Sequence, residues 1–182
     1  MKRLLVALCA LIALSCAQDE SARTSRGSAG ASAGVSANAQ SQEREPAHEG
    51  HRMYRPEQVQ WKDAPPSLPA GAKSALLEGD PAKPGFFAMR LRMPDGYRIP
   101  PHFHPGVERV TVLSGTFHLG TGQRPDWDAM QELPAGSYTT MQPGMNHYAR
   151  ASGETIVQIA TIGPWGITYV NPSDDPRQKK QP

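Results

Sequence analysis

The sequence predicts one folded domain of the all-β class, built as a sandwich or a barrel. Clusters of proline, glycine and aspartate interrupt the chain roughly every eight to twelve residues between Pro65 and Pro164. The segments between them are short and rich in β-branched and aromatic residues, which is typical of strands. One run, Met89 to Met93, alternates apolar and basic residues with a period of two, as a strand with one buried face does.

Six short runs are predicted to form strands: 86–93, 108–113, 116–119, 137–141, 147–150 and 155–161. The first contains the alternating pattern, so we expect one of its faces in the core and the other in solvent. The second and the last are rich in Val, Ile and Thr, which favour a pleated surface. Ser114-Gly115 and Ser152-Gly153 are predicted to separate successive strands.

The N-terminus predicts export. Met1-Lys2-Arg3 precedes the uncharged, largely apolar segment 4–14, and together with small residues they describe a signal peptide over 1–16. The apolar segment is shorter than the roughly twenty residues that a transmembrane helix needs. Residues 13–16, Ala-Leu-Ser-Cys, resemble a bacterial lipobox that ends at Cys16. We expect a periplasmic protein or a membrane-anchored lipoprotein carrying a lipid on Cys16; the alternative is ordinary cleavage and a secreted protein.

The rest of the chain is predicted to have three parts. Residues 17–53 are rich in Ala, Ser and Gly and read as a disordered tether, because they offer too little apolar surface to bury. Residues 54–172, roughly 120 in all, suit a single domain. Residues 173–182 form a polar C-terminal tail.

Charge and cysteine content exclude some classes of site. Loss of residues 1–16 removes two of the 19 basic residues and none of the 17 acidic ones, which leaves 17 of each. A neutral mature chain gives no electrostatic reason to bind nucleic acid. Both cysteines, Cys9 and Cys16, precede the domain, so it has no disulfide and no thiolate metal ligand.

Three histidines and one glutamate are predicted to converge. His102 and His104 lie two residues apart, so an extended chain puts them on one face and Phe103 on the other. After the turn at 105–106, Glu108 can return to the same interior, and His147 must come from another strand. Imidazole nitrogens and a carboxylate oxygen suit a borderline divalent metal such as Fe, Mn, Ni, Cu or Zn.

The spacing of these residues resembles the cupin superfamily. Its first motif, G-x5-H-x-H-x3-E-x6-G, matches Gly96, His102, His104, Glu108 and Gly115 position for position. Its second motif, G-x5-P-x-G-x2-H-x3-N, is matched at Gly136, Gly144 and His147. This second segment departs twice, because Gln142 stands at the proline position and Ala151 replaces the final asparagine. The second departure predicts a drier barrel interior.

The resemblance, to small single-domain bacterial cupins of the cupin_2 type, implies a double-stranded β-helix, the cupin jelly-roll barrel. It also implies that His102, His104, Glu108 and His147 bind one divalent transition metal. We therefore expect a metal-dependent enzyme, an oxygenase or a lyase/isomerase, acting on a small organic molecule in the barrel, with Glu108 as the catalytic residue. The alternatives are a metal-assisted binding or sensor module at the cell envelope and a storage or structural cupin. A homodimer is compatible with each.

Other residues have weaker claims to the site. His118 is predicted to be a surface or hydrogen-bonded histidine and no ligand. Trp165 and Tyr169 either close the barrel mouth or cover the core. Candidates for the cavity wall, half of them expected to face outward, are Tyr138, Thr140, Tyr148 and Gln158.

Overall fold

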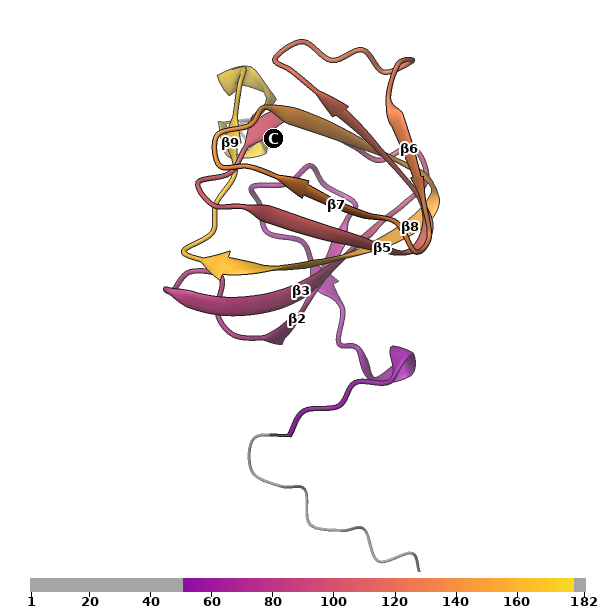
Figure 1. Cartoon of the computed structure of the whole chain (residues 1–182), viewed down its shortest axis with the longest axis vertical. Coiled ribbons are helices and arrows are strands. Elements are labelled where there is room, and N and C mark those ends of the chain that lie inside the picture. The colour runs from indigo at the N-terminus through magenta and orange to yellow at the C-terminus, as the bar shows by residue number, and fades with distance from the viewer. Residues whose placement is uncertain (1–50, 179–182) are drawn as a thin grey trace, which may run out of the picture. The chain divides into compact units, whose positions relative to one another are not determined.

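The computed structural model describes residues 51–178 of the 182-residue chain, all within the compact unit His48–Pro182. Its regular structure is made of strands and three short 3-10 helices, which confirms the all-β class (Figure 1). The strands are β1 (Lys62–Asp63), β2 (Lys73–Glu78), β3 (Gly85–Met93), β4 (Arg98–Phe103), β5 (Glu108–Thr121), β6 (Gln131–Pro134), β7 (Tyr138–Met141), β8 (His147–Gly163) and β9 (Thr168–Tyr169). The 3-10 helices are Pro56–Gln58, Pro172–Asp174 and Pro176–Gln178.

The predicted signal, the lipobox at Cys16 and the tether up to residue 50 lie outside the described residues. Within residues 51–178, no helix has the length and apolar character needed to cross a membrane.

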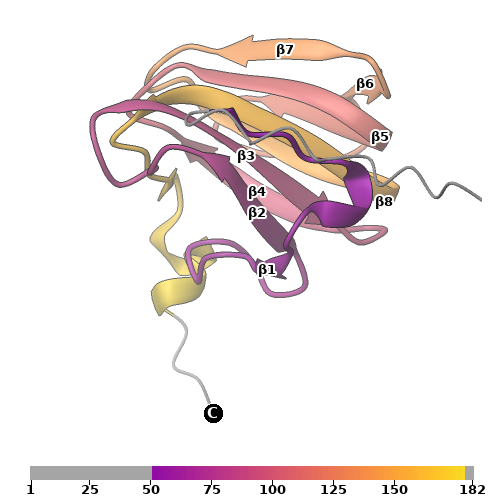
Figure 2. The ribbon, with the colours of Figure 1, turned by 90° about the horizontal axis from the view of Figure 1, so that it is seen from below.

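Strand β8 is the centre of the sheet. Its first part pairs with β4, and its second part pairs with β3, all in antiparallel register. On the other side β8 pairs with β5 along nearly its whole length, and β5 also pairs with β6 and β7. Figure 2 shows β7, β5 and β8 side by side. The long pair β5–β8 therefore joins β3 and β4, which pair with β8, to β6 and β7, which pair with β5.

The long strands bend together near Gly115. The register between β5 and β8 shifts around Ser114, and Gly115 adopts a φ of +72° that disfavours any side chain. A Cβ on Gly115 would also overlap the carbonyl oxygen of Glu154. Thr155 supports the bend because its hydroxyl donates to the carbonyl of Thr116 at 3.1 Å. The prediction that strands end at 114–115 and 152–153 is therefore wrong, because both strands continue through a bulge.

The core lies between the inner faces of these strands. Leu91 and Met93 of β3 are buried, whereas Arg92 faces outward, with its guanidinium 4.2 Å from the ring centre of Trp61. The predicted alternation of this strand is thus confirmed. The larger apolar side chains of the core that are exposed by 2% or less are Phe87, Met93, Val110, Val112, Met141 and Val157.

Candidate metal centre

The four predicted ligands come from the ends of three strands. His102 lies in β4 and His104 follows it, while Glu108 begins β5 and His147 begins β8. His102 and His147 are direct partners in the β4–β8 ladder. All four side chains are buried, with exposed fractions of 3% for His102, 6% for His104, 7% for Glu108 and 2% for His147.

Main-chain carbonyls fix the orientation of all three imidazoles. Nδ1 of His102 lies 2.7 Å from the carbonyl oxygen of Pro100, and Nδ1 of His147 lies 2.9 Å from that of Met145. Nδ1 of His104 lies 2.7 Å from the carbonyl oxygen of Gly166, 62 residues along the chain. A carbonyl oxygen can only accept, so each Nδ1 is the donor and each neutral ring has its lone pair on Nε2.

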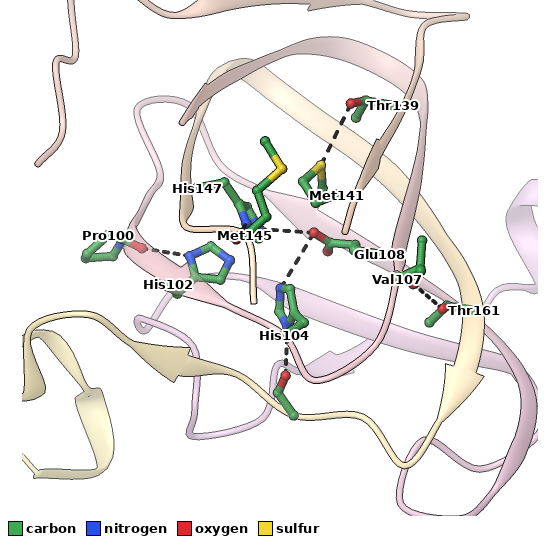
Figure 3. A network of polar contacts seen from close by, with 11 residues as sticks. Pro100, His102, His104, Val107, Glu108, Thr139, Met141, Met145, His147 and Thr161 are labelled. Atoms are coloured by element: carbon green, nitrogen blue, oxygen red, sulfur yellow. Dashed lines mark hydrogen bonds and ion pairs between the residues drawn. The ribbon is translucent and has the colours of Figure 1, made fainter. Parts of the chain in front are cut away.

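The unprotonated Nε2 atoms of His104 and His147 face the carboxylate of Glu108. Both kinds of group are hydrogen-bond acceptors, so they cannot bond to each other. Oε2 of Glu108 lies 3.1 Å from Nε2 of His147 and 3.6 Å from Nε2 of His104 (Figure 3). Both of these nitrogens are buried without a hydrogen-bond partner. Lone pairs that face each other away from water repel, and an unpaired buried polar atom is costly. The arrangement therefore fits a cation shared among these atoms.

The spacing of the donor atoms suits a metal ion. Ligands about 2.0–2.2 Å from one ion are about 2.8–3.6 Å apart at right or tetrahedral angles, and both Glu108 distances fall in that range. The ligand nitrogens of His102, His104 and His147 lie within 4.8 Å of one another. Glu108 contacts His104 and His147, so the carboxylate lies against two members of the histidine triad.

Burial also disfavours the alternative that protons alone neutralise the cluster. Loss of water lowers the pKa of His102 well below its usual value of 6.5, and the neighbouring His147 and His104 lower it further. Burial likewise lowers the pKa of His104, against the opposing effect of Glu108. Neutral imidazoles are the form that binds a metal, so the site is prepared for metal rather than for imidazolium.

Trp165 covers His104. The two rings are stacked, with their centres 4.2 Å apart and their planes 16° apart, and the indole edge also meets Phe87 at 6.0 Å. The main-chain N–H of Trp165 donates to the carbonyl of Pro81 at 2.7 Å, which holds the segment in place. Of the two roles predicted for Trp165 and Tyr169, Trp165 lines the cavity, whereas Tyr169 is a buried member of the core.

A cavity of about 260 Å³ adjoins the centre. Its far wall is aliphatic and aromatic, formed by side chains of β3, β4, β5 and β8: Met89, Leu91, Ile99, Val110, Phe117, Ala149, Val157 and Ile159. Three loops form the rest of the cavity wall. Their lining residues are Pro65, Ser67 and Leu68 in the first loop, Pro81 and Ala82 in the second, and 165–167 in the third. Two tyrosine hydroxyls fix the first loop, because Tyr169 donates to Ser67 and Tyr97 donates to Pro69.

The weaker candidates do not join the site. Tyr138 and Thr140 are exposed, and Tyr148 is buried but donates its hydroxyl to the carbonyl of Asp126. Gln158 accepts from Arg90 on the outer face of the sheet, so the prediction that some of these four residues line the cavity is wrong. His118 is half-buried in β5 and is not among the residues that line the cavity.

Solved structures show the same fold. A polyketide cyclase, RemF from Streptomyces resistomycificus, is 18% identical, with a TM-score of 0.57 over 69% of this chain and 89% of that chain. A putative acetylacetone dioxygenase from Methylibium petroleiphilum is 21% identical, with a TM-score of 0.53 over 69% of this chain and 85% of that one. The complex of Rhodobacter sphaeroides SigE with the anti-sigma ChrR also matches, at 26% identity and a TM-score of 0.44, over 59% of this chain and 51% of that chain.

No curated protein matches the chain. The family model described as the ChrR Cupin-like domain matches residues 49–165, which is more than half of the sequence and includes all four residues of the candidate centre. The chain therefore belongs to the ChrR Cupin-like domain family and is a cupin.

Proposed function

We propose that this protein is an exported, metal-dependent cupin enzyme of the oxygenase or lyase/isomerase type that acts on a small organic molecule in its barrel. The observation that carries the proposal is that the buried, unpaired Nε2 atoms of His104 and His147 both face the carboxylate of Glu108 beside a cavity. Residues 1–16 support export, and in this proposal the domain acts in the periplasm, free or anchored through Cys16.

In this proposal the histidine triad holds a divalent transition metal through its three Nε2 atoms. When bound, such an ion supplies Lewis acidity and, if it is redox-active, electron transfer. Glu108 adds a negative charge to the site, and among the described residues that line the cavity it supplies the sole carboxylate, which is the group placed to accept a substrate proton. The apolar wall excludes water and strengthens the interactions made at this end.

Metal content tests the first half of the proposal. Full-length protein, purified without added metal and analysed by mass spectrometry, should contain about one equivalent of a transition metal. His102→Ala, His104→Ala and His147→Ala should each lose it, whereas His118→Ala, a half-buried histidine outside the cavity, should keep it. Equal metal content in the four variants would refute the site.

Catalysis is tested on the metal-loaded protein. Oxygen uptake and product formation are measured with small diols, diketones and thiols, and Glu108→Gln is the comparison. We expect turnover in the wild type and a loss of at least about 100-fold in Glu108→Gln, which removes the proton acceptor but keeps its shape.

A binding or sensor module is the second candidate. It is favoured by one observation: in the lining formed by the described residues, the polar side-chain groups besides the four ligand candidates are the hydroxyl of Ser67 and the indole N–H of Trp165. An enzyme with so few polar groups has little acid–base chemistry beyond Glu108. Recovery of an organic molecule unchanged from the metal-loaded protein, together with no turnover, would favour this second function.

A further inference from the structure

The cavity beside the candidate centre is polar at one end only. Besides the histidine triad and Glu108, the polar side-chain groups among the described lining residues are the hydroxyl of Ser67, in the loop 65–68, and the indole N–H of Trp165, which is stacked on His104. No lysine or arginine is among the lining residues of the described chain. A charge placed on the apolar wall would lose its hydration and gain no partner, which costs several kcal/mol.

Three arginines on the strands and segments around the cavity, Arg90, Arg92 and Arg177, make contacts elsewhere. Arg90 donates to Gln158 on the outer face of the sheet, and Arg92 lies over the ring of Trp61. Arg177 reaches the mouth segment from outside, where it donates to the carbonyl of Ile167 at 3.2 Å. That guanidinium is already paired with Asp175, through contacts of 2.7 and 2.8 Å. None of these cations is free to receive a carboxylate or a phosphate inside.

The size of the cavity limits the ligand. A cavity of about 150 Å³ with aliphatic and aromatic walls holds benzene. The cavity of about 260 Å³ therefore holds a molecule of roughly ten non-hydrogen atoms. Ala149 and Val157 of β8 narrow it from one side, and Trp165 and Ile167 cover it from another.

We propose that the ligand of this site is a compact, largely apolar molecule with a single oxygen-bearing end and no second charged group. Its polar end meets the histidine triad and Glu108, and its apolar body lies against Leu91, Val157 and Ile159. The inference rests on the proposed metal site and deepens it by naming the ligand class. It excludes dicarboxylates and free amino acids, which carry a second charged group, and phosphorylated sugars, whose hydroxyl-rich body would find no hydrogen-bond partners on the apolar wall.

Three hydroxamates test this class, because they share one metal-binding head and differ in the body attached to it. The full-length protein is loaded with Co²⁺, and binding is followed through the visible absorption of the cobalt. Benzohydroxamate should bind at least about tenfold more tightly than acetohydroxamate, because its ring adds five carbons of buried apolar surface. A carboxylate at the far end of the ring, as in 4-carboxybenzohydroxamate, should cost at least about tenfold in affinity.

Two variants assign these differences to the cavity. Ala149→Leu fills the space and should abolish the preference for benzohydroxamate, whereas Ala160→Leu, half-buried on the same strand but outside the lining, should preserve it. Ser67→Lys places a cation in the loop 65–68 and should recover at least about tenfold for the carboxylated probe. Ser173→Lys, an exposed position outside the lining, should recover nothing.

The outcomes separate the ligand class from the metal site. A protein that takes up no Co²⁺ would overturn the proposed function and this inference with it. A protein that binds Co²⁺ but prefers acetohydroxamate, or binds the carboxylated probe as well as benzohydroxamate, would overturn the ligand class alone. Equal responses of Ser67→Lys and Ser173→Lys would also overturn it, because the ring would then lie outside the cavity.

Discussion

Replacing Trp165 with alanine removes the indole that covers His104 and separates two roles of this residue. The ring is half-buried and contributes one stacked pair with His104 and one edge contact with Phe87. Truncation of a fully buried aromatic residue costs about 3–5 kcal/mol, so a half-buried one should cost about 2 kcal/mol. The free energy of unfolding in the presence of chelator should fall by that amount.

Metal affinity should fall as well. Groups that orient a ligating histidine are worth about 10–100-fold in affinity, and the bond from Nδ1 of His104 to the carbonyl of Gly166 remains in this variant. We therefore expect Trp165→Ala to lose about tenfold in metal affinity, the lower end of this range. Trp165→Phe should lose less, because its ring can still stack on His104. Zinc affinity is measured by competition with a coloured chelator, and stability by urea unfolding in EDTA.

Trp61→Ala is the matched control. Trp61 is also half-buried, but it packs under Arg92 on the outer face of the sheet, away from the cavity. This variant should lose stability and keep its zinc affinity. If Trp165→Ala loses only stability, or if both variants lose zinc affinity equally, then the stacked indole does not orient His104.

Three further predictions follow from acid–base chemistry, backbone geometry and the N-terminus. Because burial lowers the pKa of His102 and of His104, the unfolded chain binds more protons than the folded one as the pH falls below about 6.5. The chelated protein should therefore be most stable above about pH 6.5 and lose stability toward pH 5; a flat profile in urea unfolding would contradict this. Gly115→Ala should cost at least about 2 kcal/mol, because a positive φ and a blocked Cβ position act together, whereas Gly136→Ala, with a positive φ but open space, should cost about 1 kcal/mol. Wild-type protein should fractionate with membranes and Cys16→Ser should not, as judged by immunoblotting; soluble wild-type protein with an N-terminus after Cys16 would favour ordinary cleavage.

The pair His102 and His104 could be predicted because its signal is local, whereas His147, which lies on another strand, was expected from the second motif. His102 and His104 share a face in any extended chain, and the fixed distances to Glu108 and Gly115 match a known motif. The contacts of the structure agree with this prediction, since His147 is the ladder partner of His102. The presence of Glu108 in the site was expected from the motif spacing, whereas its contacts with His104 and His147, at 3.6 and 3.1 Å, came from the structure.

Strand ends were harder to predict, because glycine signals both a turn and a bulge. The sequence places a break at Gly115, yet the positive φ there lets β5 bend and continue. Strand β4 was absent from the predicted runs because it contains Pro100 and Pro101. Its register with β8 shifts between Ile99 and His102, around those two residues, so the prolines cost no ladder bond there.

The role of Trp165 had no local signal. Its contact with His104 joins segments about sixty residues apart, and so does the hydrogen bond from His104 to Gly166. Both contacts depend on the docking of 163–166 against the loop at Pro81 and Lys83, where a Cβ on Gly163 would collide with main-chain oxygens. This placement of Trp165 and Gly166 beside His104 depends on how distant segments pack in the folded domain. Neither strand alternation nor a sequence motif predicts it.

The three carbonyl partners of the imidazoles have an evolutionary consequence. Many metal sites tune a ligating histidine through a carboxylate behind it, and a single substitution can then change the basicity of the ligand. Here that position belongs to the backbone of Pro100, Met145 and Gly166, which every descendant of the fold inherits regardless of its side chains. Natural variants of this protein can therefore diversify their chemistry through the cavity wall and Glu108, while the electron-donating strength of the three imidazoles stays nearly constant.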